Sequence, residues 1–417
     1  MDKFVIEGGK PLDGEIKVFG AKNAILPMMA GAILSEGKTI IRNVPNIRDV
    51  SVFIKLLEHL GASCFYNNHT LEIDTTNVNK TDAPYELVCQ MRAGFLVAAP
   101  LLARLKKACV SFPGGCALGA RNIDIHLKGF EKFGAKIKEE GGYITLSADK
   151  LKGCEIYLDY PTHTGTENLI MAGVLADGKT IIENCAKEPE IVDFALFLKK
   201  MGAKIEGEGS STIIIDGVSS LVPCEYSPIP DRIEAGTFLI TGAITKGRVF
   251  VQNAIYEHMR GLIAKMSEMG VIIKRKDSGI EAIGKERLKA TNVITGPYPS
   301  FSTDLQPLIS SLMCIASGTS IVKETVFNER TSHIFELSRM GAKIRITGSE
   351  IIIEGVKNLS GVNIMASDIR QGAALVLAAL SASGKTIIDR VYHIDRGYEC
   401  LEERLVTLGA SITRIKE

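Results

Sequence analysis

The sequence contains no tryptophan, few aromatic residues and almost no net charge. Its 49 Lys and Arg balance 48 Asp and Glu, and a net charge of +1 gives no overall field to hold nucleic acid or an anionic membrane. We therefore expect neither as a partner. The longest apolar runs, AGFLVAAPLLA and AALVLAALSAS, are well short of the roughly 20 residues of a membrane helix, so they predict buried core helices.

Motifs for common metals and cofactors are absent as well. The sequence has no Cys-x-x-Cys, no paired histidine spacing, no phosphate-binding lysine loop and no GxGxxG after a strand. We expect no metal and no cofactor. An odd count of 9 cysteines and an N-terminus, MDKFVIEGGK, without a signal-length apolar run are typical of a cytoplasmic protein. The oligomeric state stays open, and a monomer is compatible with the sequence.

An internal repeat organises the 417 residues, a length that predicts two or three domains of about 150 residues. A small-x-Gly phrase opens a β-branched run, as in SEGKTIIRN and ASGKTIIDR, and a second phrase such as LGAS or MGAK follows about 25 residues later. The first phrase occurs at Gly37, Gly178, Gly247, Gly318 and Gly384, with a degenerate copy near Lys107. The second phrase occurs at Gly61, Gly134, Gly202, Gly270, Gly341 and Gly409.

Each of the six units has the same expected elements. An amphipathic helix lies between the two phrases and ends at the second glycine, two short β runs form a hairpin, and a helix apolar on nearly every face follows. Because such a helix must be surrounded by protein, we predict an α/β (α+β) fold. It is a two-domain inside-out α/β barrel of βαβαββ-type repeats, three per pseudo-threefold domain, with the internal helices buried and a cleft between the domains. A continuous six-unit solenoid is the alternative.

The residues at the expected starts of the internal helices do not follow the repeat and are mostly charged. Helix N-termini present unpaired N–H groups and partial positive charge, so several of them around one cleft would bind an anion. These residues are Lys22 with Asn23, Arg92, Thr164 with Gly165, Asp231 with Arg232, Asp304, and Asp368 with Arg370. A second set follows the repeat strands: Arg48, Glu190, His258, Arg330 and Arg396. Any one of these residues could be a solvated cap, and their recurrence is the evidence for function.

The segment PGGCALGAR in the degenerate second repeat is the most distinctive local feature. Two glycines before Cys116 predict a flexible loop, and a loop cysteine near Arg121 can be a reactive thiol of low pKa.

Motifs along essentially the whole chain resemble those of the UDP-N-acetylglucosamine 1-carboxyvinyltransferases, of the enolpyruvyl transferase superfamily. They are GAKNAILP at Gly20, QMRAGFLV around Arg92, PGGCALGAR around Cys116, KEPEIVD at Lys187, PDRIEAGTF around Asp231, STDLQPL around Asp304, SDIRQGAALVLAAL around Arg370 and YHIDRGYE around Arg396. The related enolpyruvylshikimate-phosphate synthase lacks the PGGC loop. The stretch YPTHTGTEN departs from the family's serine-valine-glycine version.

The resemblance implies a reaction and an arrangement of domains. The enolpyruvyl group of phosphoenolpyruvate would move to the 3′-hydroxyl of UDP-N-acetylglucosamine, with release of phosphate, in the first committed step of peptidoglycan precursor synthesis. The first domain would span residues 21–229 and carry the Cys116 loop. The second would combine residues 1–20 with 230–417, and the active site would lie in the cleft between them.

The resemblance also implies roles for individual residues. Cys116 would be the general acid and the target of the epoxide fosfomycin, and Asp304 or Lys22 would take the hydroxyl proton. The phosphoenolpyruvate site would comprise Lys22, Asn23, Arg121, Arg330, Arg370 and Arg396, of which Arg396 is also counted as catalytic. The UDP-N-acetylglucosamine site would comprise Asn23, Arg92, Arg121, Asn122, Ile123, Asp124, Ile125, Thr164, Asp304 and Val326.

Two other functions stay open from the sequence. The same chemistry could act on another acceptor, such as 3-phosphoshikimate, or the chain could be a non-catalytic paralogue that binds a nucleotide sugar. Retention of Lys22, Cys116, Asp304 and Arg396 argues against the second alternative.

Overall fold

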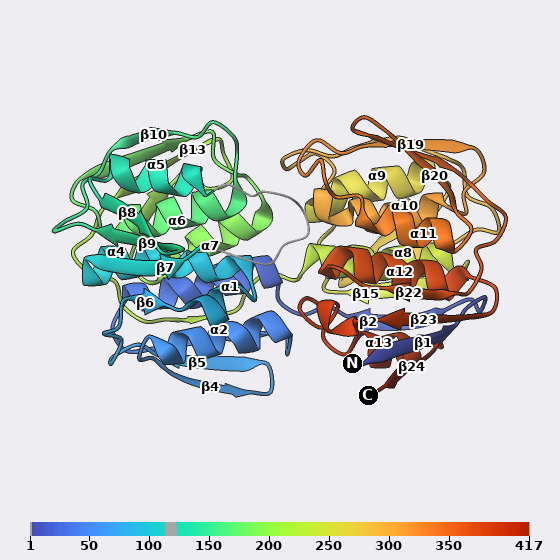
Figure 1. Ribbon diagram of the computed structural model, residues 1–417, viewed down its shortest axis with the longest axis horizontal. Helices are drawn as coiled ribbons and strands as arrows, with labels where there is room; N and C mark the ends of the chain where they lie inside the picture. The colour runs from blue at the N-terminus through green and yellow to red at the C-terminus, as the bar shows by residue number, and fades with distance from the viewer. Residues whose placement is uncertain (1, 113–122, 417) are drawn as a thin grey trace. The chain divides into compact units, whose positions relative to one another are not determined.

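The computed structural model describes residues 2–112 and 123–416, which form two compact α/β units (Figure 1). The first unit contains the described residues between 20 and 229, and the second unit contains residues 2–19 together with 230–416. Each unit has a hydrophobic core of its own.

The sheets of the first unit share one strand order. In each, the strand that follows the first glycine phrase pairs with a short parallel strand on one side and with an antiparallel hairpin on the other. In that order the sheets are β14 (Glu225–Tyr226), β3 (Lys38–Ile41), β5 (Thr70–Asp74) and β4 (Ser63–Asn67); β6 (Asp82–Ala83), β7 (Lys107–Ser111), β9 (Tyr143–Ser147) and β8 (Lys136–Glu140); and β10 (Glu155–Tyr157), β11 (Lys179–Glu183), β13 (Thr212–Asp216) and β12 (Lys204–Glu206).

The sheets of the second unit repeat this order, and two of them include strands from the N-terminus. They are β2 (Asp13–Lys17), β15 (Arg248–Gln252), β17 (Gly279–Ile283) and β16 (Ile272–Lys276); β18 (Val293–Ile294), β19 (Thr319–Lys323), β21 (Glu350–Glu354) and β20 (Lys343–Thr347); and β22 (Asn363–Met365), β23 (Lys385–Asp389), β1 (Lys3–Glu7) and β24 (Ser411–Ile415).

Strand pairing brings the end of each unit back to its beginning. In the first unit, β14 pairs parallel with β3, with Glu225 opposite Ile40. In the second unit, β1 lies between β23 and β24, so Phe4 pairs with both Ile388 and Arg414 (Figure 1). A linear solenoid would leave the first and last repeats of each unit apart. The predicted α/β class is confirmed, and the sheets of the described residues are separate four-stranded sheets rather than one continuous hydrogen-bonded barrel.

The apolar runs form the buried inner helices of the two units, as predicted. All residues of α8 are buried, and α8, α10 and α12 pack against one another. None of the helices in the described part of the chain is both long and apolar enough to cross a membrane. The inner helices are α1 (Lys22–Gly31) with η1 (Ala32–Leu34), η2 (Arg92–Val97) with α4 (Ala98–Leu105), α6 (His163–Val174), α8 (Arg232–Ile244), η4 (Thr303–Leu305) with α10 (Gln306–Met313), and α12 (Ile369–Ser381).

The outer helices bury one face and end near the second glycine phrase. In α2, for example, Val52, Phe53, Leu56 and Leu57 are buried. All six glycines of the second phrase have φ between 90° and 105°, the left-handed conformation expected just beyond a helix end. The outer helices are α2 (Arg48–His59), α5 (Asp124–Lys132), α7 (Pro189–Lys200), α9 (Arg260–Glu268), α11 (Ser332–Arg339) and α13 (Leu401–Thr407), and the short turns are α3 (Tyr85–Val88), η3 (Tyr256–Met259) and η5 (Val391–His393).

Gly247, from the first glycine phrase, lies where the N-terminal segment joins the second unit. A Cβ at this position would lie 1.9 Å from the carbonyl oxygen of Leu12, the oxygen that accepts a hydrogen bond from the amide of Arg248. Gly384 is the equivalent residue in the last repeat. It has φ of 87° but open space where a Cβ would stand.

Replacing these two glycines with alanine should separate close packing from backbone strain. We expect Gly384→Ala to cost about 1 kcal/mol, because only the left-handed conformation is penalised. Gly247→Ala should cost about 3 kcal/mol, because Leu12 must also move away from β15. Urea unfolding gives the free energy of unfolding of each variant relative to wild type. An equal loss of stability in the two variants would contradict the packing role of Gly247.

Candidate active site

The residues expected at the starts of the inner helices lie in the first turn of each helix. Because the rest of each helix is buried and mostly apolar, these turns are where most of its charged groups lie. Lys22, Arg92 and Arg232 are the first residues of α1, η2 and α8; Thr164 and Arg370 are the second residues of α6 and α12; and Asp304 lies in η4, which leads into α10.

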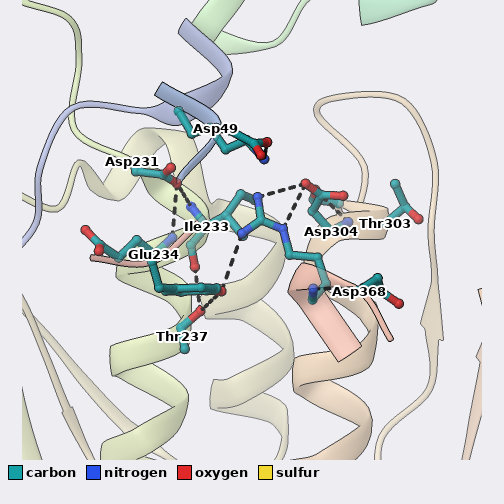
Figure 2. Close-up of polar contacts among 12 residues, drawn as sticks. Asp49, Asp231, Ile233, Glu234, Thr237, Thr303, Asp304 and Asp368 are labelled. Atoms are coloured by element: carbon teal, nitrogen blue, oxygen red, sulfur yellow. Dashed lines mark hydrogen bonds and ion pairs between the residues drawn. The ribbon is translucent and has the colours of Figure 1, made fainter. Parts of the chain in front are cut away.

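Side chains cap four of these six helix starts. Asp231 accepts hydrogen bonds from the amides of Ile233 and Glu234 at 2.8 and 3.0 Å (Figure 2). Asp368 caps α12 in the same way, Thr162 accepts from the amide of Gly165, and Ser302 accepts from the amide of Asp304. The caps satisfy backbone donors that burial would otherwise leave without partners.

Asp304 lies between two buried arginines of the second unit (Figure 2). Its Oδ1 accepts a hydrogen bond from Nη1 of Arg330 at 2.9 Å, and its Oδ2 accepts from Nε and Nη2 of Arg370 at 3.1 and 3.0 Å. The side chains of Arg330 and Arg370 are only 4% and 6% exposed, whereas that of Asp304 is 24% exposed. One carboxylate thus partners two guanidinium groups.

A loop after β19 supports Arg330. The buried Glu324 accepts hydrogen bonds from the amides of Val326 and Phe327 and from the hydroxyl of Thr303. Arg330 in turn donates to Thr303 at 3.0 Å. The sequence analysis did not single out Glu324 or Thr303, although Thr303 lies within the quoted STDLQPL motif.

Arg370 has a second buried partner, Tyr398. Its Nη1 donates to the Tyr398 hydroxyl at 3.4 Å, and its guanidinium carbon lies 5.8 Å from the centre of the ring. Burial opposes the charge on Arg370, but Asp304, Tyr398 and Asp231 outweigh burial and raise the pKa of the guanidinium above its usual range. Arg370 is therefore a permanent cation.

Lys22, in the first unit, forms a buried ion pair. Its Nζ lies 2.7 Å from Oδ2 of Asp49, and the two side chains are 11% and 4% exposed. Asn23 follows Lys22 in the first turn of α1 and is half-buried. The paired Asp49 had no signal in the sequence apart from its position beside Arg48. Tyr398 had none apart from its place in the YHIDRGYE motif.

Three of the residues expected to bind the nucleotide sugar line one small pocket of the first unit. They are Arg92, Ile123 and Thr164, and the rest of the lining is Phe95, Leu96 and His126. The sequence analysis therefore brought together residues that the fold places side by side, although it treated His126 only as a histidine without a metal-ligand partner. Two other expected residues lie next to the pocket: Asp124 and Ile125 begin α5, where Asp124 is exposed and Ile125 half-buried.

His126 connects the pocket to the core. The amide nitrogen of Asn168 donates to its Nδ1 at 2.9 Å, which leaves the ring proton on Nε2, 3.4 Å from the hydroxyl oxygen of Thr164. Burial and the nearby Arg92 lower the pKa of His126 to about 3, so the ring is neutral at physiological pH. The neutral ring donates to the Thr164 oxygen and leaves the Thr164 O–H available to donate.

His163 begins α6 and lies among carboxylates. Its Nδ1 is 3.1 Å from Oε1 of Glu167, one turn along the helix. Burial opposes its charge, but Glu167, Glu188 and Glu190 outweigh burial and raise the pKa of His163 to about 9. His163 belongs to the YPTHTGTEN stretch that departs from the resembled family, and the imidazolium adds a positive charge next to Thr164.

Three of the expected site residues lie outside the described residues: Cys116, Arg121 and Asn122. Arg396 is half-buried between η5 and α13, two residues before Tyr398. Within residues 2–112 and 123–416, no group of three or more His, Cys, Asp or Glu side chains could hold a metal ion.

The sequence profile of EPSP synthase (3-phosphoshikimate 1-carboxyvinyltransferase) matches residues 6–405. The chain therefore belongs to the EPSP synthase family. Two solved structures agree in fold. The enolpyruvyl transferase NikO from Streptomyces tendae has a TM-score of 0.90 at 24% identity, covering 100% of this chain and 99% of its own. EPSP synthase from Acinetobacter baumannii has a TM-score of 0.77 at 18% identity and full coverage of both chains.

Full-length relatives define the similarity more narrowly. The chain is 50% identical over 416 residues to the UDP-N-acetylglucosamine 1-carboxyvinyltransferase of Desulfatibacillum aliphaticivorans, covering 100% of both proteins. It is 51% identical over 417 residues to the protein of the same name from Lawsonia intracellularis, again covering 100% of both. The resemblance identified from the sequence motifs is confirmed.

Substituting Asp304 should reveal how strongly the two arginines depend on it. We expect Asp304→Asn to lower the free energy of unfolding by about 3 kcal/mol, because two buried cations lose their shared anion. Asp13→Asn is the matched control: Asp13 also takes two hydrogen bonds from one arginine, Arg248, but both side chains are exposed. Loss of this exposed ion pair in Asp13→Asn should leave the free energy of unfolding unchanged. Denaturant unfolding measures both, and a fully stable Asp304→Asn would contradict the pairing.

His163 should make stability depend on alkaline pH. A pKa raised from 6.5 to about 9 means that the folded protein keeps a proton that the unfolded chain releases. This stabilisation is complete below pH 6.5 and is lost as the pH rises to about 9, a fall of about 2 to 3 kcal/mol. We expect His163→Gln to remove the fall.

His59→Gln is the control for His163, because His59 pairs with the exposed Asp82. The free energy of unfolding is measured for wild type and both variants at intervals between pH 6 and 9.5. A fall of the same size in wild type and His163→Gln would contradict the assignment to His163.

Proposed function

We propose that this chain transfers the enolpyruvyl group of phosphoenolpyruvate to the 3′-hydroxyl of UDP-N-acetylglucosamine and releases phosphate. This transferase reaction is the first committed step of peptidoglycan precursor synthesis. Full-length identity of about half to UDP-N-acetylglucosamine 1-carboxyvinyltransferases supports the assignment most directly. The chemistry of the candidate site agrees with it, because both substrates are anionic and the described clusters present several fixed cations.

The donor carries a carboxylate and a phosphate, and each has candidate partners. Arg330 and Arg370 hold the carboxylate, since guanidinium groups match carboxylates in geometry and in charge. The two arginines share the carboxylate of Asp304 rather than having one each. The phosphate is held by the remaining candidates of the donor site: Lys22, Asn23, Arg121 and Arg396.

The acceptor binds at the pocket of the first unit. Arg92 and the Thr164 hydroxyl supply a cation and a hydrogen-bond donor for its diphosphate, and Ile123 supplies an apolar wall. The remaining candidates complete the nucleotide-sugar site: Asn23, Arg121, Asn122, Asp124, Ile125, Asp304 and Val326.

The reaction needs one proton removed and one added. The acceptor oxygen gives its proton to Asp304, with Lys22 as a second proton carrier, and forms a bond to C2 of the enolpyruvyl group, while Cys116 delivers a proton to C3. The tetrahedral intermediate then loses a proton from C3 and expels phosphate, which restores the enol double bond. The surrounding cations stabilise the charge that develops on the oxygens of this intermediate.

Free cysteines support a cytoplasmic location. The eight cysteines in the described part of the chain are all unpaired. A reducing compartment would keep them so, and it would also keep Cys116 in the thiol form that a general acid requires.

The assay for this function measures phosphate. Purified protein with phosphoenolpyruvate should release phosphate when UDP-N-acetylglucosamine is present and should release none with 3-phosphoshikimate. Release with 3-phosphoshikimate alone would move the chain to a different acceptor. Binding of the nucleotide sugar without any phosphate release would indicate a non-catalytic paralogue.

Alkylation serves as the control for Cys116. Fosfomycin should add one adduct to the intact mass in the presence of UDP-N-acetylglucosamine. Cys116→Asp keeps a proton donor and should retain phosphate release without forming the adduct. Cys64 should stay unlabelled, because burial raises the pKa of its thiol to about 12. Labelling of Cys64 would contradict the role of Cys116.

A further inference from the structure

Tyr398 forms a hydrogen bond with Arg370, one of the two arginines that pair with Asp304. It is 1% exposed, and its hydroxyl lies between Nη1 of Arg370, at 3.4 Å, and Oγ1 of Thr237, at 2.8 Å. Thr237 lies on α8 and is 2% exposed (Figure 2). A hydroxyl buried this deeply is expected to have at least one hydrogen-bond partner, and that of Tyr398 has two.

The direction of each hydrogen bond follows from the groups present. A guanidinium group only donates, so the Tyr398 oxygen accepts from Arg370. The Tyr398 O–H then donates to Thr237, whose own O–H donates to the carbonyl oxygen of Ile233 at 2.9 Å. The relay runs from Arg370 to the backbone of α8, and every donor in it has an acceptor.

The phenol stays protonated throughout this relay. Burial raises the pKa of Tyr398, and although Arg370 and the hydrogen bond with Thr237 lower it, burial dominates. A neutral phenol can accept from Arg370 and donate to Thr237 at the same time, whereas a phenolate could not donate.

All three nitrogens of Arg370 are engaged in this arrangement. Asp304 takes Nε and Nη2, and Tyr398 takes Nη1. Held by Asp304 alone, the guanidinium plane could pivot about that carboxylate. Held also by Tyr398, whose ring is anchored in the core, the plane is fixed. The three bonds use three of the five N–H donors of Arg370, and two are left to bind an anion.

We propose that the Tyr398 hydroxyl, supported by Thr237, is a positioning element that fixes the guanidinium plane of Arg370 for the carboxylate of the enolpyruvyl donor. This inference rests on the proposed function, which gives Arg370 its ligand. Tyr398 does not touch the donor and acts through Arg370. The competing explanation is that Tyr398 and Thr237 form an ordinary buried hydrogen bond that contributes only to stability.

The test compares hydroxyl deletions on α8 and at Tyr398. Tyr398→Phe and Thr237→Val break the relay, whereas Thr237→Ser keeps it. Thr241→Val is the matched control: Thr241 is also buried on α8, and its hydroxyl also donates to the carbonyl four residues earlier, that of Thr237, at 3.0 Å.

Steady-state kinetics give the first measurement. Tyr398→Phe should raise the KM for phosphoenolpyruvate about tenfold, the effect of weakening one hydrogen bond to a charged group. The KM for UDP-N-acetylglucosamine should stay within twofold of wild type. Thr237→Val should raise the donor KM in the same direction, and Thr237→Ser and Thr241→Val should not. An unchanged donor KM in Tyr398→Phe, or an equal rise in Thr241→Val, would overturn the proposal.

Nuclear magnetic resonance of the ligand-free protein separates failure of this proposal from failure of the proposed function. The side-chain N–H signals of Arg370, assigned by their loss in Arg370→Lys, should show slow rotation of the guanidinium group in wild type and Thr241→Val. Rotation should be at least several-fold faster in Tyr398→Phe. Equal rotation rates would overturn the positioning role even in an active enzyme. Faster rotation in a protein that releases no phosphate would uphold the relay and reject only the function.

Discussion

Burial of the inner helices is the constraint on which the rest of the structure depends. A helix surrounded by protein must satisfy the N–H groups of its first turn without help from water. Thr162, Asp231, Ser302 and Asp368 do so by capping their helices with side-chain oxygens. Since the bodies of these helices are mostly apolar, most of their charged residues lie in or next to the first turns. The constraint that builds each core therefore also places candidate site residues at the starts of its inner helices.

Charge compensation is the second consequence of this burial. Arg330, Arg370 and Lys22 are cations with little exposure to solvent, and each has a carboxylate within 3.1 Å. In the second unit the carboxylate of Asp304 pairs with both Arg330 and Arg370. In the first unit Asp49 pairs with Lys22, so an anionic ligand of Lys22 must compete with Asp49.

Much of the repeat architecture could be predicted from the sequence, because it depends on patterns among residues that are close together in the chain. The second-phrase glycines end the outer helices in the left-handed conformation, and AKIRITGSEIIIEG forms the predicted hairpin of β20 and β21. The charged residues at helix starts were also found by spacing. Tyr398 and Thr237 were not, since they pair with each other across 161 residues of the chain. Glu324 was not found either, because Thr303, the partner that connects it to the cluster, lies 21 residues away. His126 was visible only as a histidine with no metal-ligand spacing, and its role depends on Asn168, 42 residues away.

The amino-acid sequence by itself determined the repeat, the α/β class, the buried helices and, through its motifs, the family. These properties depend on hydrophobic periodicity and on residues close together in the chain. Only the tertiary structure decided that β1 completes the sheet of β23 and β24, that Asp304 pairs with both Arg330 and Arg370, and that Tyr398 reaches Arg370. Hydrogen bonds and ion pairs act over about 3 Å, and closeness of that kind between distant segments arises only when the chain has folded.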